Sequence, residues 1–437
     1  AQDAIRHSVA SRGLGDVYKR QSRSNEKGCR LAALFRLDGR LRVSESDEKS
    51  SLRTCPQRLR NLAFHRIMYP VFAVPFSGNK NGERLGVYMA EIVLGLGTSH
   101  SPMLSLPGDM WGDYAARDKG NPMLLSLEDG STKTYDELLA TADPDIASRL
   151  TTENFEAQYD ACQRGIVALE QSMLEADPDV VVIVGDDQEE LFFDDNMPMF
   201  SIYWGDSMHL TPRGMGEGAS PATKASMWGY GTEEMDVPVD SALGLHLIES
   251  LIDDDFDIAH ARYMNHEAGG TVGPIGYLNA PIVTKRRHQA MPHAYSYVVK
   301  RIMNNQIRPI VPVSQNTFYP PNQPTPRRCY NLGKSMAKAI KDWDTDKKVA
   351  VVGSGGLSHF LVDEEIDQLA LKGMKEKDGE ALAALPRCRL NSGSSEILNW
   401  ITAAAACEHL DMDVVEYVPV YRSPAGTGGG WGFAVWK

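Results

Sequence analysis

Apolar residues recur in two alternating patterns from residue 89 to the end of the chain. Residues 153–176 carry apolar side chains at helical spacing and are stopped by Asp177-Pro178, which predicts an amphipathic helix. Similar patterns predict helices over 240–253, 330–343 and 395–407. Compact apolar runs predict strands over 91–97, 179–185, 257–264, 308–313, 347–356 and 414–421. This alternation predicts an α/β fold, a layered sheet flanked by helices, that forms one large domain over 89–437.

Three long segments interrupt the predicted elements, namely 101–150, 204–238 and 279–298. They are rich in Gly, Pro, Met and polar residues. Long loops in a compact domain often bind ligands or cover a site, so we expect these segments to surround one.

Residues 1–88 do not follow the pattern. Arginines are scattered through them and no apolar periodicity is sustained, whereas Met89 stands directly before the first strong strand. We interpret 1–88 as a poorly structured N-terminal extension, either disordered or an artefact of the gene model. A basic arm that binds an acidic partner is the alternative.

Charge is distributed unevenly along the chain. Residues 1–88 hold 17 Lys and Arg against 8 Asp and Glu, whereas the remainder holds 28 against 50, a net charge of −22. An acidic body of this kind argues against nucleic-acid and anionic-membrane partners and favours a small substrate in a local pocket. No run reaches the roughly 18 apolar residues that span a bilayer, no secretory signal is evident, and the six cysteines form no CxxC pair. We therefore expect a cytoplasmic protein.

Polar residues directly follow four of the predicted strands. The strands 91–97, 179–185, 257–264 and 347–356 lead to His100, to Asp186-Asp187-Gln188-Glu189, to His266 and to His359 respectively. Ligands of α/β sheets bind outside the carboxyl ends of the strands, so these side chains are expected to converge. Imidazoles near carboxylates suit metal binding or acid–base chemistry.

An ordered set of short motifs makes this expectation more specific. They are Thr-Ser-His100-Ser-Pro, Leu-Phe-Phe-x-x-Asn-Met-Pro at 191–198, Asn-His266-Glu, Tyr319-Pro-Pro with Arg328-Cys-Tyr-x-Leu-Gly, Gly-Ser-Gly-Gly-Leu-Ser-His359 and Ser-Glu396-Ile-Leu-Asn-Trp. In this order the set resembles the class III extradiol ring-cleavage dioxygenases. The most similar type is the catalytic subunit of protocatechuate 4,5-dioxygenase together with its gallate-cleaving relatives. The resemblance covers nearly all of 89–437.

The resemblance implies a non-haem Fe(II) held by two histidines and one glutamate. The first histidine maps to His100 and the glutamate to Glu396, whereas Gln188 stands where the second histidine is expected. An amide oxygen can still bind the metal, but it is a weaker donor than imidazole.

Several groups are candidates to compensate for this departure. The carboxylates of Asp186, Asp187 and Glu189 would make a harder site and shift its preference toward Mn(II). His209 is a further candidate from elsewhere in the chain. Loss of the metal is the remaining alternative.

The resemblance also implies acid–base and substrate-binding residues. His359 maps to the base that takes a catechol proton, and His266 maps to a residue that binds oxygen or substrate and helps proton delivery. The tail 421–428 resembles a substrate-side loop, in which Arg422 and Thr427 would hold a substrate carboxylate.

The implied activity is extradiol cleavage of a catechol- or gallate-type acid with O₂, by a homo-oligomer or with a small second subunit. The alternatives are a non-catalytic homologue or partner subunit with an impaired metal site, and a metal-dependent hydrolase on the same scaffold.

The remaining histidines are interpreted without chemistry of their own. His246 and His260 lie in apolar segments and are taken as structural. His288 and His293 share a segment with Lys285, Arg286 and Arg287, which we interpret as a solvated basic loop, with a substrate-carboxylate clamp as the alternative.

Overall fold

The computed structural model describes residues 89–212, 220–265, 288–304 and 306–437. The interpretation of residues 1–88 as an extension lies outside these residues and stays a prediction. Within the described part, no helix is long and apolar enough to cross a membrane.

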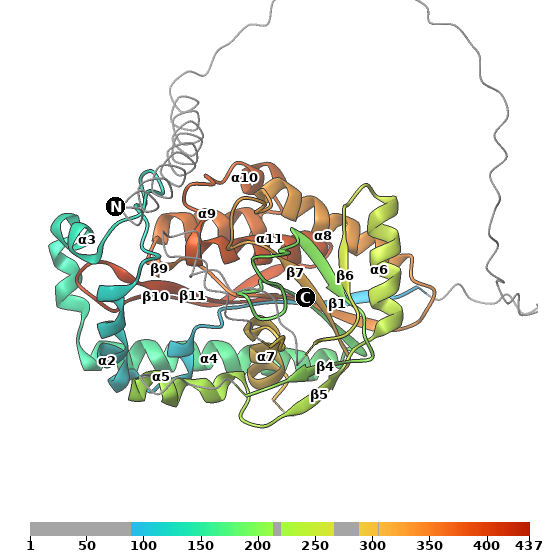
Figure 1. Cartoon of the computed structure of the whole chain (residues 1–437), viewed down its shortest axis with the longest axis horizontal. Helices are drawn as coiled ribbons and strands as arrows, with labels where there is room; N and C mark the ends of the chain where they lie inside the picture. Colours follow the sequence, from blue (N-terminus) through green and yellow to red (C-terminus); the bar gives the residue numbers. More distant parts are fainter. Residues whose placement is uncertain (1–88, 213–219, 266–287, 305) are drawn as a thin grey trace, which may run out of the picture.

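A mixed sheet of nine strands runs through the centre of the molecule (Figure 1). Its strands follow the order β10-β11-β1-β8-β2-β7-β3-β6, with β9 paired to β11. Four neighbouring strands are parallel: β1 (Glu91–Thr98), β8 (Lys348–Ser354), β2 (Val180–Gly185) and β7 (Ile310–Gln315). The others are β3 (Phe200–Tyr203), β6 (Ala259–Ala261), β9 (His359–Leu361), β10 (Met412–Tyr421) and β11 (Thr427–Trp436). Four pairings are antiparallel, namely β1–β11, β10–β11, β9–β11 and β3–β7, so the sheet is mixed.

Helices cover both faces of this sheet (Figure 1). One face carries α6 (Ser241–Asp253), α8 (Pro326–Lys341), α9 (Glu364–Lys375) and α11 (Ile397–Ala406), and the other carries α4 (Thr152–Ala176) and α7 (His293–Tyr297). The predicted α/β fold with a helix-flanked sheet is therefore confirmed.

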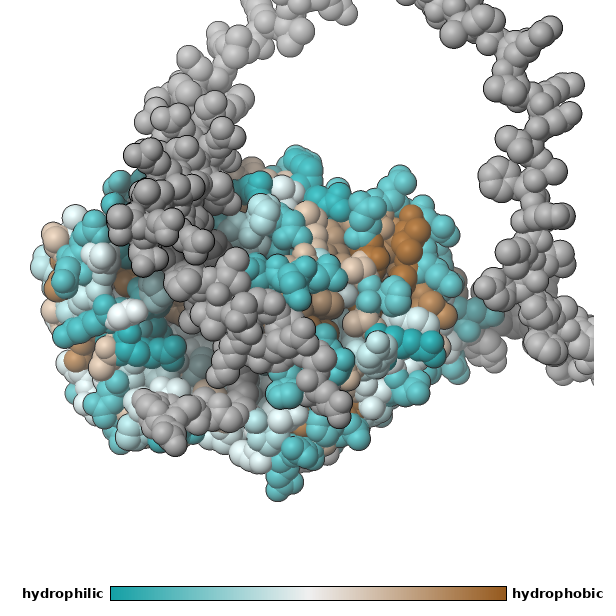
Figure 2. All heavy atoms as spheres, in the orientation of Figure 1, coloured by the Kyte–Doolittle hydropathy of each residue, from teal (hydrophilic) through white to brown (hydrophobic). Residues whose placement is uncertain are grey.

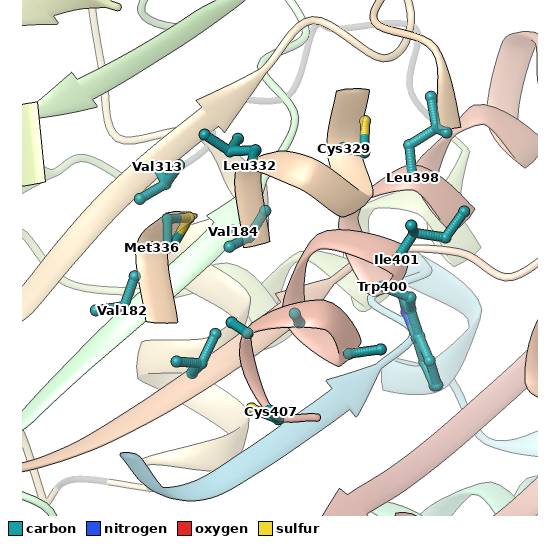
Figure 3. Packing of buried hydrophobic residues seen from close by; sticks show 14 of the residues in the cluster. Val182, Val184, Val313, Cys329, Leu332, Met336, Leu398, Trp400, Ile401 and Cys407 are labelled. Carbon is teal, nitrogen blue, oxygen red and sulfur yellow. The ribbon is translucent and has the colours of Figure 1, made fainter. Parts of the chain in front are cut away.

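The apolar runs fill a core on each face of the sheet. In β2, Val182 and Val184 pack against Leu332 and Met336 of α8, as Figure 3 shows, while the alternate residues of β2 face the α4 side. A strand buried on both faces reads as a continuous apolar run, which is why 179–185 carries no polar alternation. Fully burying one such side chain contributes about 1.5–3 kcal/mol.

Local capping sets the helix boundaries. The side chain of Thr151 accepts the backbone N–H of Asn154 at the start of α4, and Asp177 ends the helix in a left-handed conformation with φ 43°. Helix α8 begins four residues before its predicted start, because Thr325 caps it and Pro326 occupies its first turn.

The long segments contain short elements of their own. Segment 101–150 holds α2 (Trp111–Ala115), α3 (Tyr135–Thr141) and several 3₁₀ turns. Segment 204–238 holds α5 (Pro221–Ser226) and the antiparallel pair of β4 (Ser207–Leu210) and β5 (Met235–Pro238). A further short helix, α10 (Gly379–Ala383), follows α9. The face drawn in Figure 2 is mostly hydrophilic, with an apolar area over α6, on which Leu245 and Ile252 are exposed.

Candidate active site

Four side chains of metal-ligand type meet at the carboxyl ends of the parallel strands. They are His100, Asp186, His293 and Glu396, all buried, and one ligand atom of each lies within 4.8 Å of the others. His100 follows β1 and Asp186 follows β2, whereas His293 opens α7 and Glu396 directly precedes α11. The sheet therefore brings the two strand ends together, and one helix from each face supplies a further ligand atom.

A hydrogen-bond relay fixes the orientation of His100. The hydroxyl of Ser354 donates to the carbonyl of Ala294 at 2.7 Å, so it accepts from Nδ1 of His100 at 3.1 Å. The lone pair of Nε2 is left on the cluster side, 3.3 Å from Glu396 Oε2. An outer partner of this kind is typical of a metal-binding histidine.

His293 and His359 are oriented in the same way. Nδ1 of His293 donates to Glu190 Oε2 at 2.8 Å, and Nδ1 of His359 donates to the carbonyl of Leu357 at 3.1 Å. Glu190 Oε2 also accepts the backbone N–H of His293, and a carbonyl oxygen can only accept, so each neutral ring keeps the lone pair of Nε2. Nε2 of His359 lies 3.5 Å from Glu396 Oε1.

Glu396 is the negative centre of the cluster. Its Oε2 accepts the backbone N–H of Gly356 at 2.7 Å. Burial alone would raise the pKa of Glu396, but His359 and His100 outweigh it and hold the pKa well below its usual range. Gly355 is required beside it, because its φ is +114° and a Cβ there would lie 2.4 Å from the carboxylate.

Asp186 has an unsatisfied oxygen in the same cluster. Its Oδ2 accepts from the Gln188 amide at 3.0 Å, whereas its Oδ1 is buried without a hydrogen-bond partner among the described residues. Burial, together with the charge of Glu396, raises the pKa of Asp186. A buried carboxylate oxygen without a partner is costly. A cation among these four side chains would satisfy it, so the residues present fit a divalent metal.

Gln188 reaches the cluster with its amide nitrogen. Nε2 donates to Asp186 Oδ2 at 3.0 Å and to Glu396 Oε1 at 3.2 Å. Its predicted role as a metal ligand through the amide oxygen stays a prediction, since the nitrogen faces the two carboxylates in this structure.

The other candidate compensating residues lie in different environments. Asp187 accepts the backbone N–H groups of Glu190, Leu191 and Phe192 and so shapes the turn. His209 lies on β4 and bonds Asp236 of β5 at 2.8 Å, outside the cluster.

A cavity of about 200 Å³ opens beside the cluster. Its lining includes His100, Gln188, His293, His359 and Glu396, together with Tyr114, Arg117 and Arg422. A cavity of about 150 Å³ holds benzene, so one aromatic ring fits here. His266 lies outside the described residues, and its assigned role stays a prediction.

The two residues predicted to bind a substrate carboxylate, Arg422 and Thr427, both bond to a carboxylate of the protein itself, Asp118. Arg422 donates to both oxygens of Asp118 at 2.6 and 2.8 Å, and the hydroxyl of Thr427 donates to Asp118 Oδ2 at 2.5 Å. All three side chains are buried. Carboxylate binding by Arg422 and Thr427 stays a prediction, but these donors already have an acceptor.

Sequence reasoning missed His293. Its interpretation as part of a solvated loop is wrong, because the residue is only 7% exposed and begins α7. The apolar residues that follow it, Ala294-Tyr295-Ser296-Tyr297-Val298, were the signal for burial. His246 and His260 are bonded to Ala339 and Trp204, in keeping with a structural role.

Comparison with known proteins identifies the scaffold. Residues 150–410 match the family model described as the catalytic LigB subunit of aromatic ring-opening dioxygenase. The chain belongs to this family. The resemblance found in the sequence is thereby confirmed, and LigB dioxygenases are metal-dependent enzymes.

Named relatives of this LigB-family chain are distant. It is 32% identical over 126 residues to a gallate dioxygenase of Pseudomonas putida, covering 28% of this chain and 30% of the relative. It is 27% identical over 191 residues to a 2,3-dihydroxyphenylpropionate/2,3-dihydroxicinnamic acid 1,2-dioxygenase of Photorhabdus laumondii, covering 44% and 46%. The chain thus matches less than half the length of these two relatives.

One solved structure is similar over most of its length. It is the uncharacterized protein JW3007 from Escherichia coli K12, with 11% identity and a TM-score of 0.34, covering 78% of this chain and 98% of that one. A score this low carries no argument about the LigB-family chain.

Proposed function

We propose that this LigB-family protein cleaves the ring of a catechol-type aromatic acid by the extradiol route, with O₂ and a divalent metal, Fe(II) or alternatively Mn(II). The observation that carries the proposal is a single cavity, wide enough for one ring. Its lining includes three residues of the buried cluster, His100, His293 and Glu396, and a separate imidazole, His359. Binding and proton transfer can therefore act on the same substrate.

The residues that would hold the metal come from the cluster of His100, Asp186, His293 and Glu396. The two adjacent oxygens of a catechol would chelate a metal held by these residues, which favours their deprotonation. Two imidazoles with carboxylate oxygens are the donor set of non-haem Fe(II) oxygenases, whereas a larger share of oxygen donors suits Mn(II).

His359 is the proposed base for the second catechol proton. Its Nδ1–H is held by the Leu357 carbonyl, so Nε2 is the atom that accepts a proton. Burial alone would lower the pKa of His359, but the carboxylate of Glu396 outweighs it and the pKa is raised. The ring has little freedom to move, because a Cβ at Gly393 would lie 2.3 Å from its Cδ2. A positioned imidazole of this kind suits general-base catalysis near neutral pH.

Arg117 is the proposed partner of the substrate carboxylate. It lines the cavity, and its one hydrogen bond among the described residues goes from Nη1 to the hydroxyl of Tyr114. The guanidinium lies 4.8 Å from the centre of the Tyr114 ring, which restricts its position. In contrast to Arg422, it has no carboxylate within ion-pair distance in the described part of the chain. A planar guanidinium can bind a carboxylate through two hydrogen bonds.

Oxygen consumption tests the proposal directly. Full-length protein reconstituted with Fe(II) or Mn(II) without oxygen would be mixed with protocatechuate, gallate or catechol, while oxygen uptake and the yellow ring-fission product are recorded. We expect stoichiometric metal and uptake with at least one diol. Bound metal without uptake, or no metal at all, would instead support the non-catalytic homologue. Release of a hydrolysis product without oxygen uptake would support a hydrolase.

A further inference from the structure

We infer that His293 supplies the second imidazole ligand that the chain lacks at position 188, and that Glu190 holds it in place. The inference rests on the proposed function, because it requires that the cluster binds a metal. It assigns the coordinating role to a residue 105 positions further along the chain than Gln188.

The two imidazoles of the cluster lie against each other. The ring centres of His100 and His293 are 4.5 Å apart at 69°, an edge-to-face arrangement. Tyr230 packs beside His293 with ring centres 6.1 Å apart, and its hydroxyl donates to the carbonyl of His100. Each histidine has its Nδ1 engaged away from the cluster, and each offers a ligand atom within 4.8 Å of those of Asp186 and Glu396.

Glu190 holds His293 by two bonds. Its Oε2 accepts both Nδ1–H, at 2.8 Å, and the backbone N–H of His293, at 3.1 Å. The two side chains are 10% and 8% exposed, so water screens the pair weakly. A carboxylate on the outer nitrogen fixes the tautomer and raises the basicity of a ligating histidine. The pair has the form of a metal-binding histidine with its outer partner.

The turn after β2 connects this pair to the other ligands. Within residues 186–190, Asp186 is part of the cluster and Gln188 donates to the carboxylates of Asp186 and Glu396. Glu190 accepts from His293. The backbone N–H of Ala290 also donates to the carbonyl of Glu190 at 2.9 Å, which ties the approach to α7 to the same turn. The turn after β2 has Gln188 instead of a histidine, but through Glu190 it positions His293 of α7.

Gln188 has a different task in this arrangement. Its amide nitrogen donates to Asp186 and Glu396, two carboxylates that would repel each other. We assign it as a positioning residue for these oxygens. The ligands are then His100, His293 and Glu396, with Asp186 as a further oxygen donor.

Metal affinity of four single variants tests the assignment without using turnover. Chelator competition would give the Fe(II) and Mn(II) dissociation constants of wild type and of His293→Gln, Glu190→Gln, Gln188→Ala and, as a matched control, His260→Gln on the surface. We expect affinity to fall more than 100-fold for His293→Gln, about 10- to 100-fold for Glu190→Gln and less than that for Gln188→Ala, with no change for the control. Loss at Gln188→Ala with retention at His293→Gln would overturn the inference.

Pulsed EPR of the nitric oxide adduct of Fe(II)-loaded protein counts the imidazole nitrogens bound to the metal. Its main result comes from the wild-type protein, so it does not depend on whether a variant folds. Two coordinated imidazole nitrogens are expected in wild type and one in His293→Gln. A single imidazole in wild type would overturn the assignment while leaving the proposed function standing. Wild type that binds no metal would overturn both, and ring cleavage that His293→Gln retains in full would overturn the inference alone.

Discussion

At the scale of single residues, His359 separates metal binding from proton transfer. It lies in the cavity wall with one nitrogen bonded to Leu357 and the other toward Glu396, and it is not part of the ligand cluster. We expect His359→Gln to lower kcat by about 10²- to 10⁴-fold, because glutamine cannot accept the proton, with metal stoichiometry unchanged. Oxygen uptake and metal analysis check this. A kcat within threefold of wild type would remove His359 from the base role, and His260→Gln serves as the unaffected control.

Arg117 controls the choice of substrate if it binds the carboxylate. Removing one charged hydrogen-bonding partner costs about 1.5–3 kcal/mol, so Arg117→Gln is expected to raise KM for carboxylated catechols about 10- to 100-fold. KM for unsubstituted catechol should stay the same. Arg164→Gln, an exposed arginine paired with Glu416, is the matched control. An equal rise in KM for carboxylated and unsubstituted catechols would show that Arg117 does not bind the substrate carboxylate.

Arg422 is expected to affect stability rather than specificity. It forms a buried, two-bond ion pair with Asp118, and the two side chains are 4% and 1% exposed. Arg422→Met leaves the Asp118 charge buried without its partner, which costs about 3–5 kcal/mol. Urea unfolding measures the loss. If stability is unchanged while KM for carboxylated catechols rises, Arg422 binds the substrate as the sequence first suggested.

At the scale of elements, α9 anchors Ser358, the residue directly before His359 and β9. Asp367 of α9 accepts the backbone N–H and the hydroxyl of Ser358 at 2.8 and 2.7 Å and the hydroxyl of Tyr417 at 2.9 Å. Burial raises the pKa of Asp367 to about 7, although these donors act in the opposite direction. The folded protein therefore binds more protons than the unfolded chain between about pH 4 and 7, and stability falls as pH rises through that window.

Replacing Asp367 with asparagine removes this titration. Since the amide keeps an acceptor for the Ser358 N–H, we expect Asp367→Asn to fold and its stability relative to wild type to increase by up to about 4 kcal/mol from pH 4 to pH 8. Urea unfolding of both proteins across this pH range gives the difference between their free energies of unfolding. The contributions of the other carboxylates are the same in both proteins and cancel in this difference. Parallel profiles would contradict the raised pKa. Asp367→Ala, which leaves the Ser358 donors unsatisfied, should be about 1–3 kcal/mol less stable than Asp367→Asn at every pH.

The local sequence was enough to predict the long helices and strands, but not the full set of candidate metal ligands. The helix predicted over 153–176 is α4, because its apolar spacing and its stop at Asp177-Pro178 lie within the segment itself. The polar residues at the strand ends were also predicted to lie together. His100 and His359 line the same cavity, and His100 and Asp186 belong to the same cluster. The role proposed for His293 depends on Glu190, more than 100 residues away in sequence, and a contact of this kind leaves no pattern in the local sequence.

At the scale of the whole molecule, the site joins parts of the chain that are far apart in sequence. One ligand atom comes from each of four places: the end of β1, the end of β2, the start of α7 and the turn before α11. The body that surrounds them carries a net charge of −22 over residues 89–437. Within it, the cluster brings two of these carboxylates together, so a divalent cation is the component whose binding relieves repulsion between Asp186 and Glu396.

Metal binding is therefore expected to stabilise the entire fold. A ligand that binds only the folded state at 100 times its dissociation constant adds about 2.7 kcal/mol to the free energy of unfolding. For a domain of this size that corresponds to a rise in Tm of about 4 °C. Calorimetry of apo protein, of protein with Fe(II) or Mn(II), and of protein with excess chelator measures it. The rise should vanish in His100→Ala, which loses a proposed ligand, and persist in His260→Gln. An equal rise in both variants would place the stabilising ion somewhere other than this cluster.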